Sequence, residues 1–312
     1  MGEFEIIEKY FKAAHQSDGV ELGIGDDCAV LSIPSDQQLV LTTDTLVEKV
    51  HFPEVSNAEH VGYRTCATAL SDIAAMGGTA RWASLALTTP VFDEDWFRLF
   101  VIGIERAFAY DNTLLIGGDL TRGPLAITWH ITGTISLGKA LRRSGCDIGD
   151  AIYVSGELGG AANALHLMQS NDVDPALLEP YWFPRPRLAL GRAIAPFASS
   201  CIDISDGFLG DLNHLLKASD KSGVLELERI PLAANASQLS THERLDLALN
   251  GGDDYELCFT AAQQHQESIS QVAKQLGVAL TRVGKIVSAE SEPGVFDADG
   301  EALLPESYQH FR

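Results

Sequence analysis

The stretch Gly138–Asp150, GKALRRSGCDIGD, divides the sequence into two parts. It contains three glycines and a basic cluster of one lysine and two arginines, and a long predicted strand, 125–137, comes directly before it. A chain of 312 residues is too long for one ordinary hydrophobic core. We therefore predict two domains, residues 1–138 and residues 139–312.

Predicted helices and strands alternate on both sides of this boundary. They do not follow a single strand–helix–strand rhythm, so the expected fold class is α/β with mixed sheets in both domains. Hydrophobic periodicity and turn residues predict helices at 3–15, 57–76, 93–109, 208–218 and 263–276, and a further helix ending near 198. Strands are predicted at 28–33, 38–43, 82–88, 113–116, 125–137, 151–155, 200–204 and 255–260, followed by a terminal hairpin of 283–287 and 294–297.

The bulk composition excludes several classes of protein. The formal net charge is −21, with 22 basic against 43 acidic residues, which argues against nucleic acid or an anionic membrane as the partner. The five cysteines are widely spaced and form no Cys-x-x-Cys pair, so neither a thiolate zinc site nor a disulfide framework is expected. No signal peptide and no apolar stretch of transmembrane length is visible, and we predict a cytoplasmic protein.

Seven short acidic motifs set among Gly, Ser or Thr carry the chemical information. One such motif alone is usually a turn, but several of these follow the end of a predicted strand or helix, where open α/β sheets bind ligands. Two carboxylates about 4 Å apart repel by roughly 4 kcal/mol at an effective dielectric of 20, so a site that gathers them needs cations, and hard oxygen donors favour Mg²⁺ or Ca²⁺. The motifs are Gly25–Asp27, Thr42–Thr45, Ser71-Asp72, Gly117–Asp119, Asp203–Gly207, Gly210-Asp211 and Gly251–Asp254.

Three aspartates have different explanations available. Asp72 lies near the C-terminus of its predicted helix, where the helix dipole disfavours an acid by about 0.3–1 kcal/mol, and its small apolar neighbours predict a half-buried site. A cation ligand explains it better than a local turn. Asp206 directly precedes a helix, so an N-cap and a metal ligand are both open, whereas Asp203 has no helix to cap.

The remaining candidates are weaker taken one at a time. Thr42–Thr45 closes a predicted strand with three hydroxyls and one carboxylate, which suits a hard metal but also an ordinary polar strand end. Asp119 follows two glycines, where the backbone can approach a ligand closely. Arg143 fits a phosphate fork or a solvated linker charge. His51 alone is better explained as a structural residue than as a catalytic one.

Nucleophilic catalysis is poorly supported by the sequence. There is no Gly-x-Ser-x-Gly elbow, no Walker A loop and no protein-kinase motif set. The short Gly23-x-Gly25 lacks the third glycine and the following helix of a dinucleotide-binding loop. The acidic motifs are therefore the remaining candidates for the functional site.

Together, these segments resemble the thiamine-monophosphate kinase family, whose members use ATP to convert thiamine monophosphate to thiamine diphosphate. The similarity runs from the first helix to Tyr308–Phe311, and seven weak motifs in the right order make it specific. It implies a fold like aminoimidazole ribonucleotide synthetase, with two α/β domains, and a homodimer formed through the N-terminal sheet. The matching segments are Gly23–Asp27, Thr43–Thr45 with His51-Phe52, Leu70–Gly77, Gly117–Asp119 with Thr121–Pro124, Arg143–Gly145, Asp203–Gly207 and Gly251–Leu257.

The resemblance also implies roles for individual residues, and a monovalent cation such as K⁺ as a further cofactor. The family usually has Glu where Asp253 stands, so this carboxylate reaches one methylene less far toward substrate. The implied Mg²⁺ ligands are Asp27, Thr42, Thr43, Asp44, Asp72, Asp119, Asp203 and Asp206. The implied ATP contacts are Tyr110, Gly118, Asp119, Arg143 and Ser205, and the implied contacts to thiamine monophosphate are His51, Asp253 and Tyr308.

The expected reaction is a direct in-line transfer in which a substrate phosphate oxygen attacks the γ-phosphorus of ATP while several Mg²⁺ ions neutralise both polyphosphates. The nucleophile is already an anion, so no general base is expected. Rival hypotheses are another enzyme of the same superfamily, acting on selenide, a formylglycinamide-type nucleotide or a carbamoyl group, and a non-catalytic divalent-ion-binding protein. The enzyme acting on a carbamoyl group would need a C-terminal cysteine, whereas this chain ends His310-Phe311-Arg312. The enzyme acting on selenide would be expected to carry a Cys–Lys pair near the N-terminus, and no such pair is visible.

Overall fold

The computed structural model describes residues 2–12, 19–54, 56–170, 173–290 and 292–305. Contacts between Cα atoms divide the chain into two compact units. The first consists of Met1–Ile73 and Gly78–Gly138, and the second of Ala74–Gly77 and Lys139–Arg312. Residues 1–138 are expected to bind metal and ATP and to form the dimer, and residues 139–312 to complete the nucleotide and substrate site. Both assignments stay predictions.

The first unit contains a four-stranded sheet in the order β3-β6-β4-β5. The pair β4–β5 is parallel, and the pairs β3–β6 and β4–β6 are antiparallel. The sheet consists of β3 (Gln37–Val47), β4 (Thr79–Thr89), β5 (Leu114–Arg122) and β6 (Ala126–Ser136). The unit also contains α1 (Glu3–Ile6), the short π-helix η1 (Ile7–Phe11), β1 (Val20–Leu22), β2 (Val30–Leu31), α2 (Ala58–Ala75) and α3 (Glu94–Phe108).

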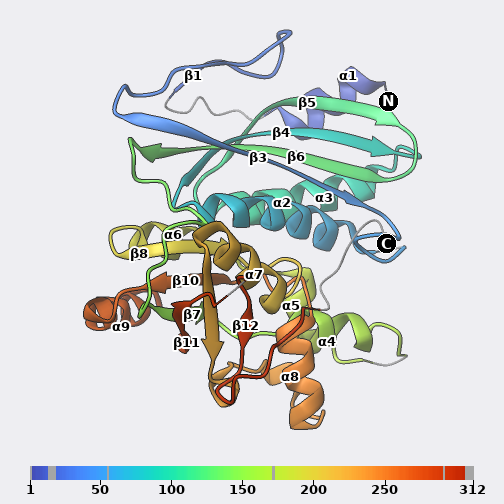
Figure 1. The fold of residues 1–312 in the computed structure, drawn as a ribbon. Coiled ribbons are helices and arrows are strands. Elements are labelled where there is room, and N and C mark those ends of the chain that lie inside the picture. Colours follow the sequence, from blue (N-terminus) through green and yellow to red (C-terminus); the bar gives the residue numbers. More distant parts are fainter. Residues whose placement is uncertain (1, 13–18, 55, 171–172, 291, 306–312) are drawn as a thin grey trace. The chain divides into compact units, whose positions relative to one another are not determined.

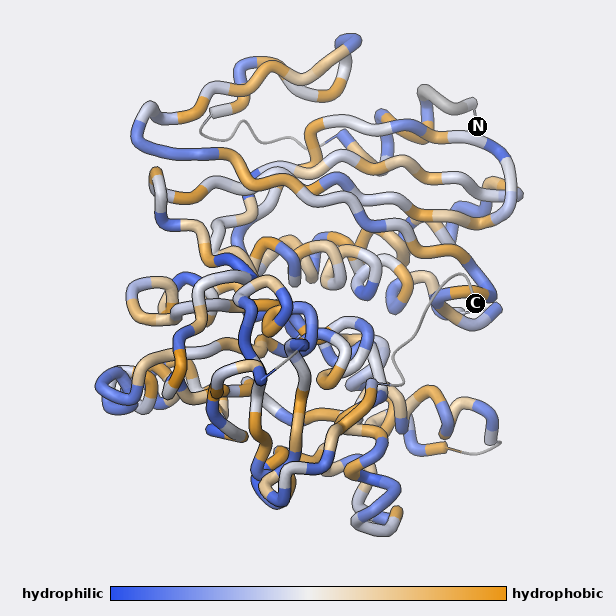
Figure 2. The backbone as a smooth tube through the Cα atoms, viewed as in Figure 1, coloured by the Kyte–Doolittle hydropathy of each residue, from blue (hydrophilic) through white to orange (hydrophobic). Residues whose placement is uncertain are grey.

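Helices α2 and α3 lie along one face of this sheet (Figure 1). Trp129 of β6 is fully buried there, and its indole nitrogen donates a 3.0 Å hydrogen bond to the hydroxyl of Thr65 on α2. We call the other side the open face. It presents Leu39 and Leu41 of β3, which are 42% and 60% exposed. Figure 2 shows hydrophobic and hydrophilic residues alternating along these strands, as expected when the two faces of a sheet have different surroundings.

The second unit contains a six-stranded sheet in the order β12-β9-β11-β7-β10-β8. Its strands are β7 (Ala151–Ser155), β8 (Ala198–Asp203), β9 (Lys221–Leu225), β10 (Leu257–Ala261), β11 (Leu280–Ser288) and β12 (Val295–Phe296). Its helices are α4 (Gly160–Leu167), α5 (Glu179–Trp182), α6 (Leu188–Ile194), α7 (Phe208–Ser219), α8 (Thr241–Asn250) and α9 (Gln266–Leu276), with 3₁₀ turns η2 (Pro175–Leu178), η3 (Leu227–Arg229), η4 (Ala234–Ala236) and η5 (Gln263–His265).

A buried ion pair joins two segments of the second unit. The guanidinium of Arg187 donates from both Nε and an Nη atom to the carboxylate of Glu256, and both side chains are mostly buried. The hydroxyl of Ser155, at the end of β7, donates to the same carboxylate. Gly156 has a φ of 60°, and a Cβ atom there would lie 2.0 Å from Glu256 Oε1, so a side chain at this position would be strained and would displace the paired carboxylate. Removing either charge would leave the other buried without its partner.

Several predicted boundaries are wrong in ways that matter for the site. Strand β3 continues to Val47 and β5 to Arg122, so Thr42–Thr45 and Gly117–Asp119 lie inside strands rather than after them. The terminal hairpin is also wrong, because β12 pairs with β9 in parallel instead of with β11. The sequence interpretation missed β9 and α8. Within the described residues, no helix is both long and apolar enough to cross a membrane.

Candidate metal and nucleotide site

A threonine and an aspartate meet at the edge strand β3. The hydroxyl of Thr42 donates a hydrogen bond to Oδ2 of Asp72, which projects from α2 thirty residues later in the sequence. Asp72 is half-buried, as its neighbours predicted. Because side chains alternate along a strand, Asp44 lies on the same, helix-covered face as Thr42. This corner therefore gathers two carboxylates and a hydroxyl, which are hard oxygen donors.

Thr43 and Thr45, which alternate with Thr42 and Asp44 along β3, point to the open face. Thr43 Oγ1 shares a 2.6 Å hydrogen bond with Nδ1 of His130, its cross-strand neighbour on β6. Two residues further along the same face, the hydroxyls of Thr45 on β3 and Thr128 on β6 lie 2.9 Å apart. Both threonine hydroxyls are thus held in place by a partner on the next strand.

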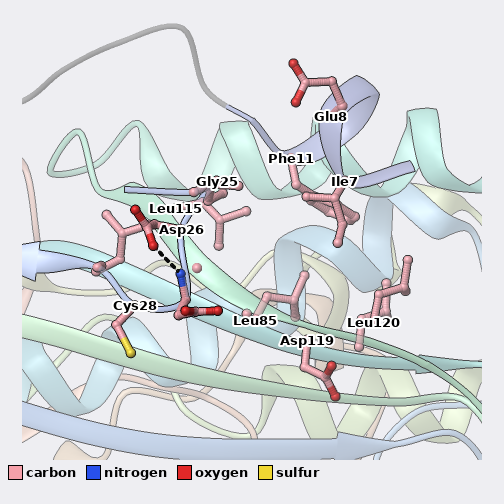
Figure 3. Close-up of a pocket in the computed structure, with 17 residues that line it drawn as sticks. Ile7, Glu8, Phe11, Gly25, Asp26, Cys28, Leu85, Leu115, Asp119 and Leu120 are labelled. Atoms are coloured by element: carbon pink, nitrogen blue, oxygen red, sulfur yellow. Dashed lines mark hydrogen bonds between the residues drawn. The ribbon is translucent and has the colours of Figure 1, made fainter. Parts of the chain in front are cut away.

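A pocket of about 550 Å³ lies beside β5, at the opposite edge of the sheet (Figure 3). Asp27 and Asp119, two of the predicted metal ligands, both line it, as does Gly118. The amide of Asp27 donates a 2.9 Å hydrogen bond to the side chain of Asp26. A Cβ atom at Gly118 would lie 2.0 Å from the carbonyl oxygen of Leu85, so only glycine fits here and the backbone stays accessible from the pocket.

The two groups of acids in the first unit do not meet within one chain. Asp119 is level with Thr45 across the sheet through Ala86 and Thr128, so it lies on the open face, while Asp44 lies on the other. Strands β6 and β4 separate the two edges, a span of about 14 Å at the usual strand spacing. Among the described residues, no group of three or more His, Cys, Asp or Glu side chains is placed to hold one metal ion.

In the second unit, two loops bring predicted site residues together. Asp203 ends β8 and is buried. The amide of Asp253 donates a 2.8 Å hydrogen bond to the carbonyl of Ser205, and a Cβ atom at Gly252 would lie 2.5 Å from the same oxygen. Asp206 is exposed in this turn, and the N-cap of α7 is Gly207. The N-cap explanation of Asp206 is therefore wrong, since glycine occupies that position.

Asp211 is a buried carboxylate for which the sequence interpretation had no role. It lies in the first turn of α7, and its Oδ2 accepts the amide protons of Ser205 and Asp206 at 3.0 and 3.1 Å. Burial, assisted by the nearby charge of Asp203, raises the pKa of Asp211 to about 8. The Gly210-Asp211 motif was the available signal, but only the fold shows that this side chain fixes the turn carrying Asp206.

The loop after α8 is held in an unusual backbone conformation. Asp253 and Tyr255 have φ angles of 72° and 50°, a region that non-glycine residues rarely adopt, and the phenol of Tyr255 donates a 3.3 Å hydrogen bond to the Asp253 carboxylate. Between them, Asp254 accepts the amide protons of Gly159 and Ala161 at the start of α4. Such strained positions persist only where the surrounding structure fixes them, and they cluster at functional sites.

The other predicted contact residues lie in separate places. His51 Nδ1 accepts the amide proton of Val47 at 3.0 Å, so a neutral ring carries its proton on Nε2. The phenols of Tyr110 and the buried Tyr63 lie 3.1 Å apart. The Arg143 side chain is exposed. Tyr308 lies outside the described residues.

Comparison with known proteins gives the same two-part organisation. The model for the N-terminal domain of AIR synthase related proteins matches residues 25–135, and the model for the C-terminal domain matches residues 147–295. A thiamine-monophosphate kinase from Escherichia coli K12 is 41% identical over 321 aligned positions, covering 99% of this chain and 98% of that protein.

Solved structures agree with this. A thiamine-monophosphate kinase from Stenotrophomonas maltophilia is 39% identical with a TM-score of 0.86, and the match covers 92% of this chain and 93% of that one. A structure described as AaThiL complexed with AMPPCP and TMP is 30% identical with a TM-score of 0.79, and the match covers 92% of both chains. Two mixed α/β domains of this kind were expected from the sequence, and that prediction is confirmed.

Proposed function

The chain belongs to the thiamine-monophosphate kinase family, and we infer from this that it transfers the γ-phosphoryl group of ATP to thiamine monophosphate. The products are thiamine diphosphate and ADP. One observation in this chain supports the inference most directly: Gly118 and Asp119, whose motif the family uses for ATP, line one pocket together with Asp27. A relative of full-length similarity is described in complex with AMPPCP and TMP, which suits the same pair of substrates.

The chemistry needs little from the protein beyond placement and charge. A phosphate oxygen of thiamine monophosphate attacks the γ-phosphorus, the new P–O bond forms, and the bond to the β-phosphate oxygen breaks as ADP leaves. The attacking oxygen is already an anion, so no side chain has to remove a proton. His51 carries its ring proton on Nε2, when neutral, and can donate it to a phosphate oxygen. In this account the side chains position the reactants and exclude other geometries.

The acidic residues suit Mg²⁺, which would neutralise the phosphates when bound. The fit rests on the donors: Thr42, Asp44 and Asp72 bring hydroxyl and carboxylate oxygens to one corner, and Asp27 and Asp119 line the pocket. Asp203 and Asp206 of the second unit are proposed as further ligands, with Asp211 positioning the turn that carries Asp206. We propose a monovalent cation such as K⁺ as an additional cofactor and a cytoplasmic location for the enzyme.

The substrate contacts remain those that the family resemblance implies. Asp253 is one methylene shorter than the usual glutamate, and its position is fixed by strained backbone and by Tyr255. Ser205 and Arg143 are proposed to contact ATP, as is Tyr110. Tyr308 is proposed to contact the thiamine phosphate.

The separation of the acids supports a homodimer in which each site uses two chains. Thr43 and Asp119 share the open face but lie at its opposite edges. If two open faces pack around a two-fold axis parallel to the strands, the β3 edge of one chain lies over the β5 edge of its partner. The exposed Leu39 and Leu41 suit such an interface. We propose that Thr43, on the open face of one chain, acts with the partner's Asp119.

The activity is tested by incubating the protein with ATP, Mg²⁺ and thiamine monophosphate and resolving the products by chromatography. We expect thiamine diphosphate and ADP in equal amounts, and none of either after chelation of the metal with EDTA. If thiamine diphosphate does not form and thiamine monophosphate leaves the thermal stability unchanged, the proposed function is wrong. Release of phosphate without thiamine diphosphate would instead favour a different enzyme of the superfamily.

A further inference from the structure

The loop between α8 and β10 carries Asp253, the proposed contact to thiamine monophosphate, in a strained conformation. Asp253 and Tyr255 have φ angles of 72° and 50°, which non-glycine residues rarely adopt. Such angles persist only where surrounding contacts fix the backbone. The contacts that hold this loop therefore determine where the Asp253 carboxylate lies.

Backbone hydrogen bonds join this loop to the turn that carries Asp206. Strands β8 and β10 are antiparallel neighbours, and their pairing continues beyond Asp203 and Leu257, where β8 ends and β10 begins. The turn has its own side-chain anchor in Asp211, so it does not depend on the loop alone. Three hydrogen bonds of 2.8 Å make the extension: from the amide of Ile204 to the carbonyl of Glu256, from the amide of Tyr255 to the carbonyl of Ile204, and from the amide of Asp253 to the carbonyl of Ser205.

The C-terminal end of the loop is fixed by the side chain of Glu256. Arg187 donates to this carboxylate from Nε, at 2.6 Å, and from an Nη atom, so its planar fork sets both the position and the direction of the carboxylate. The hydroxyl of Ser155 donates to the same carboxylate and accepts the amide proton of Leu257 at 2.9 Å. The side chains of Arg187 and Glu256 are only 16% and 10% exposed, so salt screens the pair little.

We propose that Arg187 is a positioning residue for thiamine monophosphate, acting through Glu256 on the loop that carries Asp253. This rests on the proposed function, in which Asp253 contacts the substrate, and adds a residue that places this contact without making it. Arg187 directly precedes α6 and lies 69 residues before Glu256 in the sequence, so only the folded second unit brings the two together. A group misplaced by about 1 Å loses much of its contribution to binding and turnover.

The other anchors of this region limit what the loss of Arg187 changes. Asp254 holds the middle of the loop, because it accepts two amide protons at the start of α4. Asp211 holds the turn that carries Asp206. Without Arg187, Asp253 therefore shifts while the loop stays folded and the proposed metal ligand Asp206 stays in place. The expected defect is in the use of thiamine monophosphate, with the use of ATP and Mg²⁺ nearly unchanged.

The first test measures steady-state kinetics of two variants. Arg187→Lys keeps a charge beside Glu256, and so avoids a buried unpaired acid, but loses the two-pronged donor; Arg187→Gln loses both. We expect Arg187→Lys to raise the KM for thiamine monophosphate about tenfold, and Arg187→Gln to raise it at least as much. The KM for ATP and the Mg²⁺ dependence should stay within about twofold of the wild type.

Arg282→Lys is the matched control, because it makes the same exchange in another ion pair of the second unit. The Arg282 guanidinium lies 3.9 Å from the carboxylate of Glu226, on strand β11, which β7 separates from β10. This variant should behave as the wild type. If both KM values rise together in Arg187→Lys, or if Arg282→Lys shows the same rise, the proposal is overturned.

A double-mutant cycle tests whether Arg187 acts through Asp253. Asp253→Gly removes the carboxylate and fits the positive φ of this position. If Arg187 acts by placing this carboxylate, adding Arg187→Lys to Asp253→Gly should raise the KM for thiamine monophosphate by less than about twofold more. A further rise of about tenfold, as large as that of Arg187→Lys alone, would show that the two residues act independently and would overturn the proposal.

Hydrogen exchange of the segment 251–257, followed by mass spectrometry, reports on the loop without turnover. Arg187→Lys should speed this exchange about tenfold, because the amides of Asp253 and Tyr255 lose their fixed geometry. Val295→Ala makes a cavity in the core at the β12 edge of the sheet, so it controls for general destabilisation and should leave the segment as in the wild type. Unchanged exchange in Arg187→Lys would overturn the proposal by itself. A wild type that forms no thiamine diphosphate would instead contradict the proposed function, and the exchange would still show whether Arg187 holds the loop.

Discussion

Asp72 and Thr42 show how single residues far apart in sequence form one corner of the candidate site. The sequence predicted a half-buried acid at position 72 from the small apolar neighbours on its helix, and the structure confirms this. It could not identify the partner, because the hydrogen bond to Thr42 depends on how α2 packs against β3. Chain order alone does not specify that packing.

Replacing Asp72 by Ala should abolish turnover at every Mg²⁺ concentration, because the corner loses a carboxylate in contact with Thr42. Thr42→Val, which removes only the hydroxyl, should lower kcat/KM about 10–100-fold. Steady-state rates over a Mg²⁺ titration measure both effects. Asp95→Ala, an exposed acid on α3, is the matched control and should behave as the wild type. An Asp72→Ala enzyme with near wild-type activity at saturating Mg²⁺ would show that Asp72 is not a metal ligand.

Asp211 gives a prediction for pH. Its unfolded-state pKa is about 4, and burial with the nearby Asp203 raises the folded-state pKa to about 8. The folded protein therefore binds an extra proton between these values, and this residue lowers stability as pH rises from about 4 to about 8. Asp211→Asn removes the titration and can still accept both amide protons. In metal-free urea unfolding, the variant should gain stability over the wild type at pH 8 and lose that gain at pH 4; equal destabilisation at both values would contradict this.

At the scale of helices and strands, the element types were more predictable than their ends. Strand β7 was predicted with its correct bounds because it is a short apolar run after the glycine-rich boundary. Strands β3 and β5 were predicted too short, because polar and glycine residues at Thr42–Thr45 and Gly117–Asp119 look like strand ends. Pairing with the next strand keeps both motifs extended, and this pairing is a property of the sheet.

Helix α8 was missed although its start carries a recognisable signal. Ser240 accepts the amide proton of Glu243, and the Glu243 carboxylate accepts the amide proton of Ser240, which together form a capping box. Replacing Ser240 by Ala should lower the free energy of unfolding by about 1 kcal/mol. Replacing it by Thr, which keeps the hydroxyl that donates to the Glu243 carboxylate, should largely preserve stability. Urea denaturation of both variants measures the effect, and an unchanged midpoint for Ser240→Ala would show that the cap contributes nothing.

At the scale of the whole molecule, the family could be predicted from the seven acidic motifs and their order, and the two-domain α/β organisation from the chain length, the glycine-rich boundary and the alternation of helices and strands. The sequence could not predict which of the acidic motifs lie together in space. The sheet order β3-β6-β4-β5 places Asp44 at one edge and Asp119 at the other, a fact that depends on long-range pairing. A chain of net charge −21 can bind two phosphate compounds if the carboxylates at both edges of the sheet bind cations that neutralise the phosphates.

The most direct test mixes two variants, Thr43→Ala and Asp119→Ala, each expected to be inactive alone, under conditions that exchange subunits, and measures thiamine diphosphate formation. If each site joins the β3 edge of one chain to the partner's Asp119, then a hybrid dimer contains one intact site and one site with both substitutions. Random exchange makes about half of the dimers hybrids, so about a quarter of wild-type activity should return. If both residues act within one chain, every hybrid site carries a substitution. A mixture that remains inactive after confirmed exchange would contradict the account.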